Sequence, residues 1–167
     1  EAVFSEHGVP VAVRQKVPAD RTTIGRGLLA LLACALGTGS AEELFIYLRT
    51  PGVIAKPELI DACEAEARRS GARTSADALA LWERRGTLYA VADLRRAARQ
   101  GFPALAEGLI GACGRLLAAP GRGTAPLLTG EDTTDAQAAA AITRALRALI
   151  ALPERLQPEA AALPRLL

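Results

Sequence analysis

The stretch from Thr22 to Gly52 constrains the fold most, because it predicts two consecutive helices. Residues 23–36 are apolar on nearly every side, which is typical of a helix buried in a core or a membrane. The unbroken apolar run covers only residues 28–36, whereas a membrane span needs about 20 residues. We therefore expect this helix to be the central core helix of a soluble domain.

The join between the two helices carries strong local signals. Gly37 follows the last apolar residue, and glycine readily takes the left-handed conformation that ends a helix. Ser40 and Glu43 are spaced as a capping box, in which each side chain binds a free backbone N–H of the next helix. That second helix is expected to end at Arg49, because Pro51 cannot continue it.

The rest of the chain predicts an all-α fold of about seven or eight helices with one short N-terminal β-strand, residues 9–14. Proline at the first helical position predicts a helix over 57–70, with an apolar stripe of Leu59, Ile60, Cys63 and Ala67. A second capping-box pattern starts at Thr74. Further helices are expected at 74–86, 93–100, 103–117, 133–152 (capped by Asp132) and 158–167.

The length of 167 residues predicts a single domain. We expect a strand and lead-in at 1–20, a main helical core at 21–118, a Pro- and Gly-rich loop at 119–131 and C-terminal helices at 132–167. The chain opens without methionine and in mid-pattern, so we expect it to be part of a longer protein.

Charge and cysteine usage bound the function classes. The net charge of +2 predicts no whole-domain electrostatic footprint for nucleic acid. Arginine outnumbers lysine strongly, which fits either phosphate recognition or the coding bias of a GC-rich genome. The cysteines at positions 34, 63 and 113 stand singly, so we expect core residues of a reduced, cytoplasmic protein. Residues 1–20 lack the pattern of a signal peptide.

Candidates for catalysis are few. His7 is the single histidine and has no nucleophile or acid in pattern beside it. Acidic groups at 42/43, 61/64 and 131/132/135 are explained as caps, first-turn charges or solvated faces. Gly25-Arg26-Gly27 lacks the spacing of a phosphate-binding loop. We therefore predict no catalytic residue, no metal ligand and no cofactor in this chain.

One set of arginines could form a basic face for phosphates. Its members occupy consecutive predicted helices, at Arg68, Arg69, Arg73, Arg84, Arg85, Arg95, Arg96 and Arg99. The alternative is an ordinary solvated surface, because acids at 64, 66, 83 and 93 are interleaved and no aromatic residue is available there for base stacking.

Three motifs in order resemble a known family: Gly8-Val9-Pro10, Thr23–Leu32 and Leu48-Arg49-Thr50-Pro51-Gly52. They are similar to the passage that enters the accessory helical subdomain, called 2B, of UvrD-type superfamily 1 helicases. The likeness is greatest to AddB-like helicase–nuclease subunits, the actinobacterial PD-(D/E)XK nuclease family proteins. It covers about residues 3–85. Those helicases often carry Gly-x-Gly at the turn, where this chain has Gly52 alone.

The resemblance implies a non-catalytic accessory or regulatory domain of a DNA helicase–nuclease that processes double-strand break ends for recombinational repair. The parent would be an ATP-dependent helicase and exodeoxyribonuclease, with ATP and Mg²⁺ bound in other domains. Expected partners are DNA, the other domains of the parent and a helicase partner subunit, with no membrane. Carried over by position, DNA contacts fall on Arg49, Thr50, Gly52 and Lys56. The arginine face adds Arg84, Arg85, Arg95, Arg96 and Arg99.

Two rival functions remain open. A protein-interaction scaffold predicts an exposed apolar patch on the leucine-rich helices. The ligand-binding helical portion of a transcriptional regulator predicts an internal apolar cavity and a helix pair for dimerisation.

Overall fold

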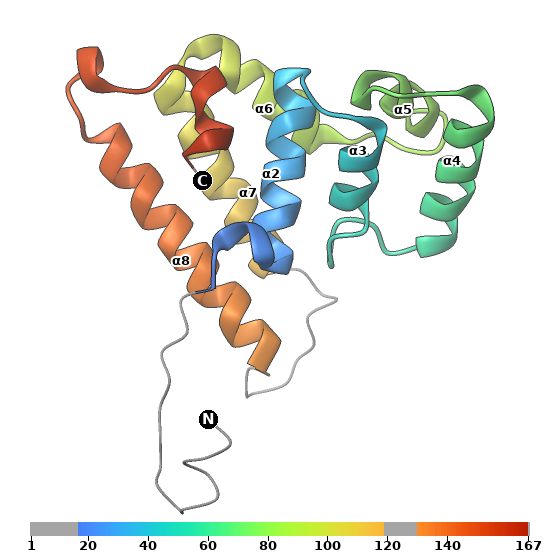
Figure 1. Cartoon of the computed structure of the whole chain (residues 1–167), viewed down its shortest axis with the longest axis horizontal. Coiled ribbons are helices and arrows are strands. Elements are labelled where there is room, and N and C mark those ends of the chain that lie inside the picture. Colours follow the sequence, from blue (N-terminus) through green and yellow to red (C-terminus); the bar gives the residue numbers. More distant parts are fainter. Residues whose placement is uncertain (1–16, 119–129, 167) are drawn as a thin grey trace, which may run out of the picture.

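A central helix, α2 (Thr23–Leu36), organises the computed structural model, which describes residues 17–118 and 130–166. It is preceded by the 3-10 turn η1 (Ala19–Arg21). The helix packs against α3 (Ala41–Leu48) on one side and against α6 (Tyr89–Gln100), α7 (Phe102–Leu117) and α8 (Gly130–Ile150) on the other (Figure 1). The predicted core helix is confirmed, with Ile24, Leu31 and Leu32 fully buried.

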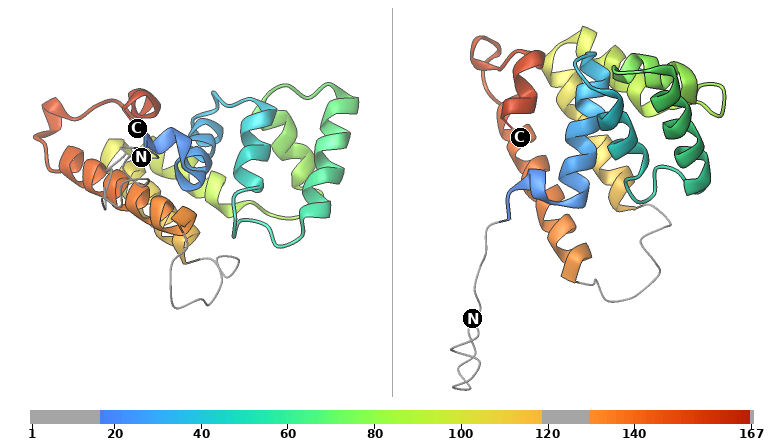
Figure 2. Two further views of the ribbon diagram at one scale, coloured as in Figure 1. Left: turned by 60° about the horizontal axis from the view of Figure 1, so that its bottom comes forward. Right: turned by 45° about the vertical axis from the view of Figure 1, so that its right-hand side comes forward.

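On the side of α3, two further helices complete a small group (Figure 2). They are α4 (Pro57–Ser70) and α5 (Ser75–Trp82), and α5 packs on both α3 and α4. The starts of α3 and α5 lie side by side, because Ala41 N–H donates to Arg73 O at 2.9 Å and Ser75 N–H donates to Gly39 O at 2.8 Å. Both predicted capping boxes are present, Ser40 with Glu43 and Thr74 with Asp77.

The predicted helix ends at glycine are confirmed where the chain needs a left-handed residue. Gly37 ends α2 with φ 76°, and Gly71 ends α4 with φ 72°. A side chain at either position would be strained, since L-residues rarely adopt these angles. Both glycines therefore fix where the chain turns back on the core.

Three expectations need correction. Leu59 is 36% exposed, because only the face with Ile60, Cys63 and Ala67 packs on α3 and α5. Helix α8 begins at Gly130, so Asp132 lies in its first turn, where an acid is also favoured. The C-terminal segment is not an α-helix but two 3-10 turns, η3 (Glu154–Leu156) and η4 (Ala160–Arg165), since Pro164 lacks the N–H that helix continuation requires.

All secondary structure in the described part of the chain is helical apart from one isolated bridge between Ser40 and Thr74, which confirms the mainly α fold. The predicted strand at 9–14 and most of the predicted loop at 119–131 lie outside the described residues. None of the helices described is both long and apolar enough to cross a membrane. The three cysteines are free and buried, as core residues are expected to be.

Candidate nucleic-acid interface

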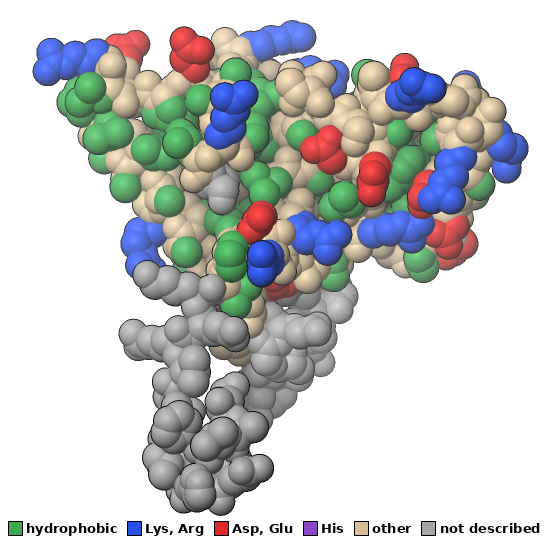
Figure 3. All heavy atoms as spheres, in the orientation of Figure 1, with side chains coloured by type: hydrophobic (Ala, Val, Ile, Leu, Met, Phe, Trp, Pro, Cys, Tyr) green, Lys and Arg blue, Asp and Glu red, His purple; other side chains and the backbone are tan. Residues whose placement is uncertain are grey.

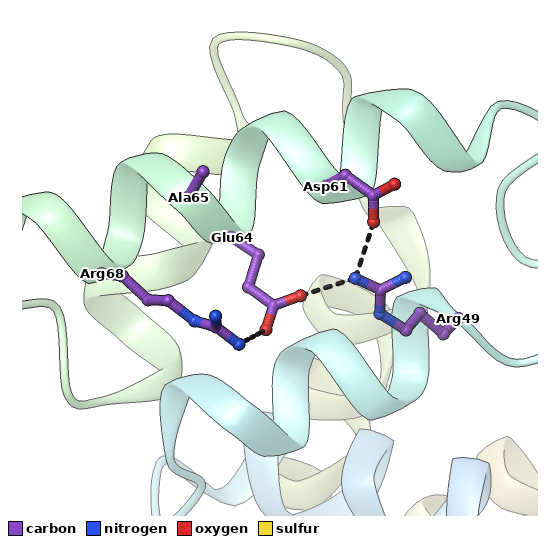
Figure 4. A pocket seen from close by; sticks show the side chains of 5 residues that line it. All are labelled: Arg49, Asp61, Glu64, Ala65 and Arg68. Carbon is purple, nitrogen blue, oxygen red and sulfur yellow. Dashed lines mark hydrogen bonds and ion pairs between the residues drawn. The ribbon is translucent and has the colours of Figure 1, made fainter.

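The turn between α3 and α4 begins with an arginine that binds α4. The Arg49 guanidinium donates to Asp61 Oδ1 at 2.7 Å and to Glu64 Oε2 at 2.6 Å (Figure 4). Arg68 forms a second ion pair with Glu64. The bond from Arg49 holds the pKa of the Glu64 carboxyl below its usual range, and the two acids raise the pKa of Arg49. Arg49 therefore positions the turn, with its charge already matched by two carboxylates.

Thr50 is the interior anchor of the same turn. It is 4% exposed, and its hydroxyl donates to Ile46 O at 3.0 Å. Its side chain lies against Gly27 of α2, where an added Cβ would fall 2.4 Å from Thr50 Oγ1. Gly25 and Gly27 are thus explained by close packing within the core helix. Thr50 faces the protein interior and holds the turn against α2.

The tip of the turn is exposed. Val53 N–H donates to Thr50 O at 3.1 Å across Pro51 and Gly52, and Gly52 has φ 88°. Proline followed by glycine in the left-handed region is the sequence pattern of a type II turn. Gly52 and Lys56 are both exposed, and Lys56 directly precedes α4. Of the four positions carried over from the resemblance, these two are open to a ligand.

A pocket of about 240 Å³ lies beside this tip, and we call it the tyrosine pocket. Its walls come from the turn (Gly52 and its neighbours), the start of α6 (Tyr89) and the end of α7 (Arg115), with Tyr47 of α3 also lining it. No aspartate or glutamate lines this pocket. The pocket therefore combines two phenols and one cation beside the predicted DNA-contacting turn.

The two tyrosines differ sharply in exposure. Tyr89 is 71% exposed, whereas Tyr47 is 5% exposed. Burial raises the pKa of Tyr47 to about 12, so its hydroxyl is protonated at neutral pH and can donate a hydrogen bond. Sequence reasoning missed both tyrosines and Arg115. Its expectation that no aromatic residue is available among the predicted arginines was wrong, because the exposed Tyr89 lies between Arg85 and Arg95. Residues 88–91 lie between the helices predicted at 74–86 and 93–100, and that gap is the signal that could have drawn attention to Tyr89.

The structure divides the remaining predicted arginines between two places. Arg84 and Arg85, which follow α5, bind the carboxylate of Glu66 at 3.0 and 2.6 Å. The arginines of α6 lie on a helix that packs on α2 and α7 rather than on α3 and α4. There Arg95 donates to Cys34 O at 3.4 Å, and Arg96 pairs with Asp93 at 3.6 Å.

Acidic side chains are interleaved with the basic ones over α3 and α4 (Figure 3). Arg99 is exposed, and within the described part of the chain it makes no ion pair. This arrangement resembles the solvated surface considered above more than one continuous basic face. The arginine contacts stay a prediction.

One residue that the sequence explained only as a local acid has a long-range role. Asp135 of α8 is buried, and its Oδ1 accepts the backbone N–H of Ile24 at 3.2 Å. Thr22 caps the same helix start by accepting from Gly25 N–H at 3.0 Å. Asp135 therefore fixes α8 to the start of the core helix, at its positive end.

Comparison with known proteins returned no relative: no protein-family model, no curated protein and no solved structure matches the chain. Within residues 17–118 and 130–166, no three His, Cys, Asp or Glu side chains gather in a group that could hold a metal ion. The described surface presents an exposed turn at Gly52 and Lys56, an exposed aromatic ring at Tyr89 and a cation at Arg115.

Proposed function

We propose that the chain is a non-catalytic accessory or regulatory module of a DNA helicase–nuclease, of the kind that processes double-strand break ends for recombinational repair. The proposal rests on the likeness to the helical subdomain of UvrD-type helicases and AddB-like subunits. Two of its three motifs lie in the described residues, in α2 and at the end of α3. They meet where Thr50 packs on Gly27.

The proposed DNA contact rests on how the turn between α3 and α4 is held in place. Arg49 holds it to α4 and Thr50 holds it to α2, while Gly52 and Lys56 are left exposed at its tip. A backbone held in place and free of bulky side chains can approach a phosphate closely. Positive charge comes from Lys56, just before α4, and from Arg115, in the pocket that Gly52 also lines.

The nine predicted DNA contacts then take different roles. Gly52 and Lys56 would touch the backbone of DNA directly, and Arg49 and Thr50 would position them. Three of the arginines would have to leave their carboxylate partners before binding phosphate: Arg84, Arg85 and Arg96. We therefore assign them a smaller share of the binding free energy. Arg95 and Arg99 of α6 remain candidates for a separate contact.

The parent protein would supply the motor and the nuclease. In this proposal ATP and Mg²⁺ bind to other domains, a helicase partner subunit completes the assembly, and the complex acts in the cytoplasm on chromosomal DNA.

A salt titration of duplex binding tests the DNA contact. We expect fluorescence anisotropy to show affinity for a blunt duplex that falls linearly on a log–log scale as salt rises. Replacing Lys56 with alanine should weaken binding and reduce the salt slope by about 1. Arg155→Ala is the matched control, because this exposed cation lies in η3, across the molecule from the turn (Figure 1). Absence of binding at low salt would remove DNA contact from the proposal.

A specific observation also favours the scaffold alternative. Leu152, Leu156 and Leu166 are exposed, with Leu156 60% exposed. Hydrophobic side chains gather on this side of the molecule, over α8 and the C-terminal segment (Figure 3). Exposed apolar patches mark interaction surfaces, so this side would dock neighbouring domains. In analytical ultracentrifugation, Leu156→Glu should reduce the fraction of the chain that sediments together with the separately produced motor domains. An unchanged fraction would argue against docking through this apolar surface.

A further inference from the structure

The tyrosine pocket is small. Its volume of about 240 Å³ lies below the ~300–1,000 Å³ of pockets that hold drug-sized ligands. A group with one ring system therefore fits better than a larger molecule. The pocket opens beside Gly52, so a ligand held in it also lies against the tip of the turn.

Tyr89 offers an aromatic surface to such a group. Elsewhere in the described chain the aromatic residues Phe45, Tyr47, Trp82 and Phe102 are buried, whereas Tyr89 is 71% exposed. Its environment therefore does not explain it as a core residue. An exposed ring beside cations is the arrangement that proteins use to stack unpaired bases, and it is tolerant of base identity.

The polar groups around the pocket match an anion. Arg115 lies in the last turn of α7 and is exposed, and no described carboxylate pairs with it. Tyr47 is 5% exposed and lines the pocket, where the nearby Arg115 cation acts to lower the pKa of its hydroxyl against the larger effect of burial. A phenol hydroxyl on the pocket wall can donate a hydrogen bond to an oxygen of a bound group.

We propose that the tyrosine pocket binds one unpaired nucleotide of a single-stranded DNA tail. The base stacks on Tyr89, Arg115 binds the adjoining phosphate, and the Tyr47 hydroxyl donates to an oxygen of the nucleotide. This inference rests on the proposed function and deepens it, because Gly52 and Lys56 then contact the neighbouring duplex. The module would thereby recognise the junction between duplex and single strand.

Three DNA probes test this assignment on the 167-residue chain by fluorescence anisotropy: a blunt duplex, the same duplex with a short single-stranded tail, and the single strand alone. We expect the tailed duplex to bind more tightly than the blunt one. Tyr89→Ala should weaken binding of the tailed duplex about 5- to 140-fold, the range for loss of one base–aromatic stack. It should leave binding of the blunt duplex unchanged.

Paired variants separate the contributions. Tyr89→Trp keeps a stacking surface and should retain tail binding. Arg115→Ala should weaken tail binding, whereas Arg155→Ala should not. Tyr47→Phe removes only the hydroxyl and should cause a smaller loss. Circular dichroism checks that each variant is folded, and the exposure of Tyr89 and Arg115 makes unfolding by their replacement unexpected.

Other outcomes would overturn the assignment. The nucleotide assignment would be refuted if the single-stranded tail added no affinity over the blunt duplex. It would also be refuted if Tyr89→Ala lowered the affinity for blunt and tailed duplex by the same factor. Either result would leave the proposed duplex contact intact. If an equal concentration of a mononucleotide displaced the tailed duplex, the pocket would be a site for a free nucleotide instead. Loss of motor-domain association in Tyr89→Ala, with tail binding unchanged, would make the pocket a protein-docking site. Failure of every probe to bind wild type would refute DNA contact itself.

Discussion

Replacing Gly27 with alanine should destabilise the chain, although alanine is the better helix former. The added Cβ would lie 2.4 Å from Thr50 Oγ1 and 2.8 Å from Thr50 Cγ2. Those distances are too short for a van der Waals contact, so Thr50 would have to move. Its hydroxyl is held by the hydrogen bond to Ile46 O, and the turn would move with it.

The magnitude follows from opposing contributions to the free energy of unfolding. Alanine in a helix interior gains about 0.5–1 kcal/mol over glycine. Overpacking a close contact costs about 1–3 kcal/mol, and a lost hydrogen bond costs about 0.5–1.5 kcal/mol more. The net expectation for Gly27→Ala is a loss of about 0.5–4 kcal/mol, which lowers the melting temperature of a domain this size by about 1–16 °C.

Thermal and urea unfolding followed by circular dichroism measure this loss. Gly114→Ala is the matched control, because Gly114 also lies within a helix but has no atom within 4 Å of an added Cβ. It should stabilise the chain by about 0.5–1 kcal/mol. Adding Thr50→Ala to Gly27→Ala removes the two clashing atoms, so the two substitutions should be strongly non-additive.

The reasoning would be refuted by a Gly27→Ala variant that is as stable as wild type or gains stability as Gly114→Ala does. Purely additive effects of Gly27→Ala and Thr50→Ala would refute it as well. Either result would mean that the turn is not seated on α2 through this contact.

Other predictions follow from the buried and paired groups. Asp135→Ala should cost about 0.5–2 kcal/mol in urea unfolding, because Ile24 N–H loses its acceptor. The carboxyl of Glu64 has its pKa held below the ordinary 4.5 by Arg49, so the stability from this pair is present above pH 4.5 and is lost as pH falls through the lowered value. Arg49→Ala should reduce the drop in the free energy of unfolding at acid pH. The reduction should be no more than ~1 kcal/mol, because the pair is partly exposed. Burial raises the pKa of Cys34 from 9.0 to about 11, so a thiol reagent at pH 8 should label it only after unfolding. Because the unfolded thiol loses its proton at lower pH than the folded one, the free energy of unfolding should fall as pH rises from 9 to about 11.

Helix starts and ends were predictable because their signals are local. Ser40 binds Glu43 three residues away, and Thr74 binds Asp77 in the same way. Gly37 and Gly71 act through their own backbone angles. Such features need no knowledge of the rest of the fold, so the sequence predicts them well.

The site was predictable only in part because its members come from distant segments. Gly52 and Lys56 follow from the motif, but Tyr47, Tyr89 and Arg115 meet only after α3, α6 and α7 are packed. Ion pairing of the arginines is equally non-local, since Arg84 and Arg85 reach Glu66 across 18 and 19 residues. A count of arginines along the sequence cannot tell which charges are already neutralised.

The bond between Asp135 and Ile24 bears on the order in which the chain can fold during synthesis. The two residues are 111 positions apart, so α2 leaves the ribosome long before its acceptor is made. At about 5–20 residues per second, the apolar core helix would wait several seconds or more for α8. During that interval its leucines have only the earlier helices to cover them, so chaperone contact with the nascent chain should be concentrated on residues 24–35.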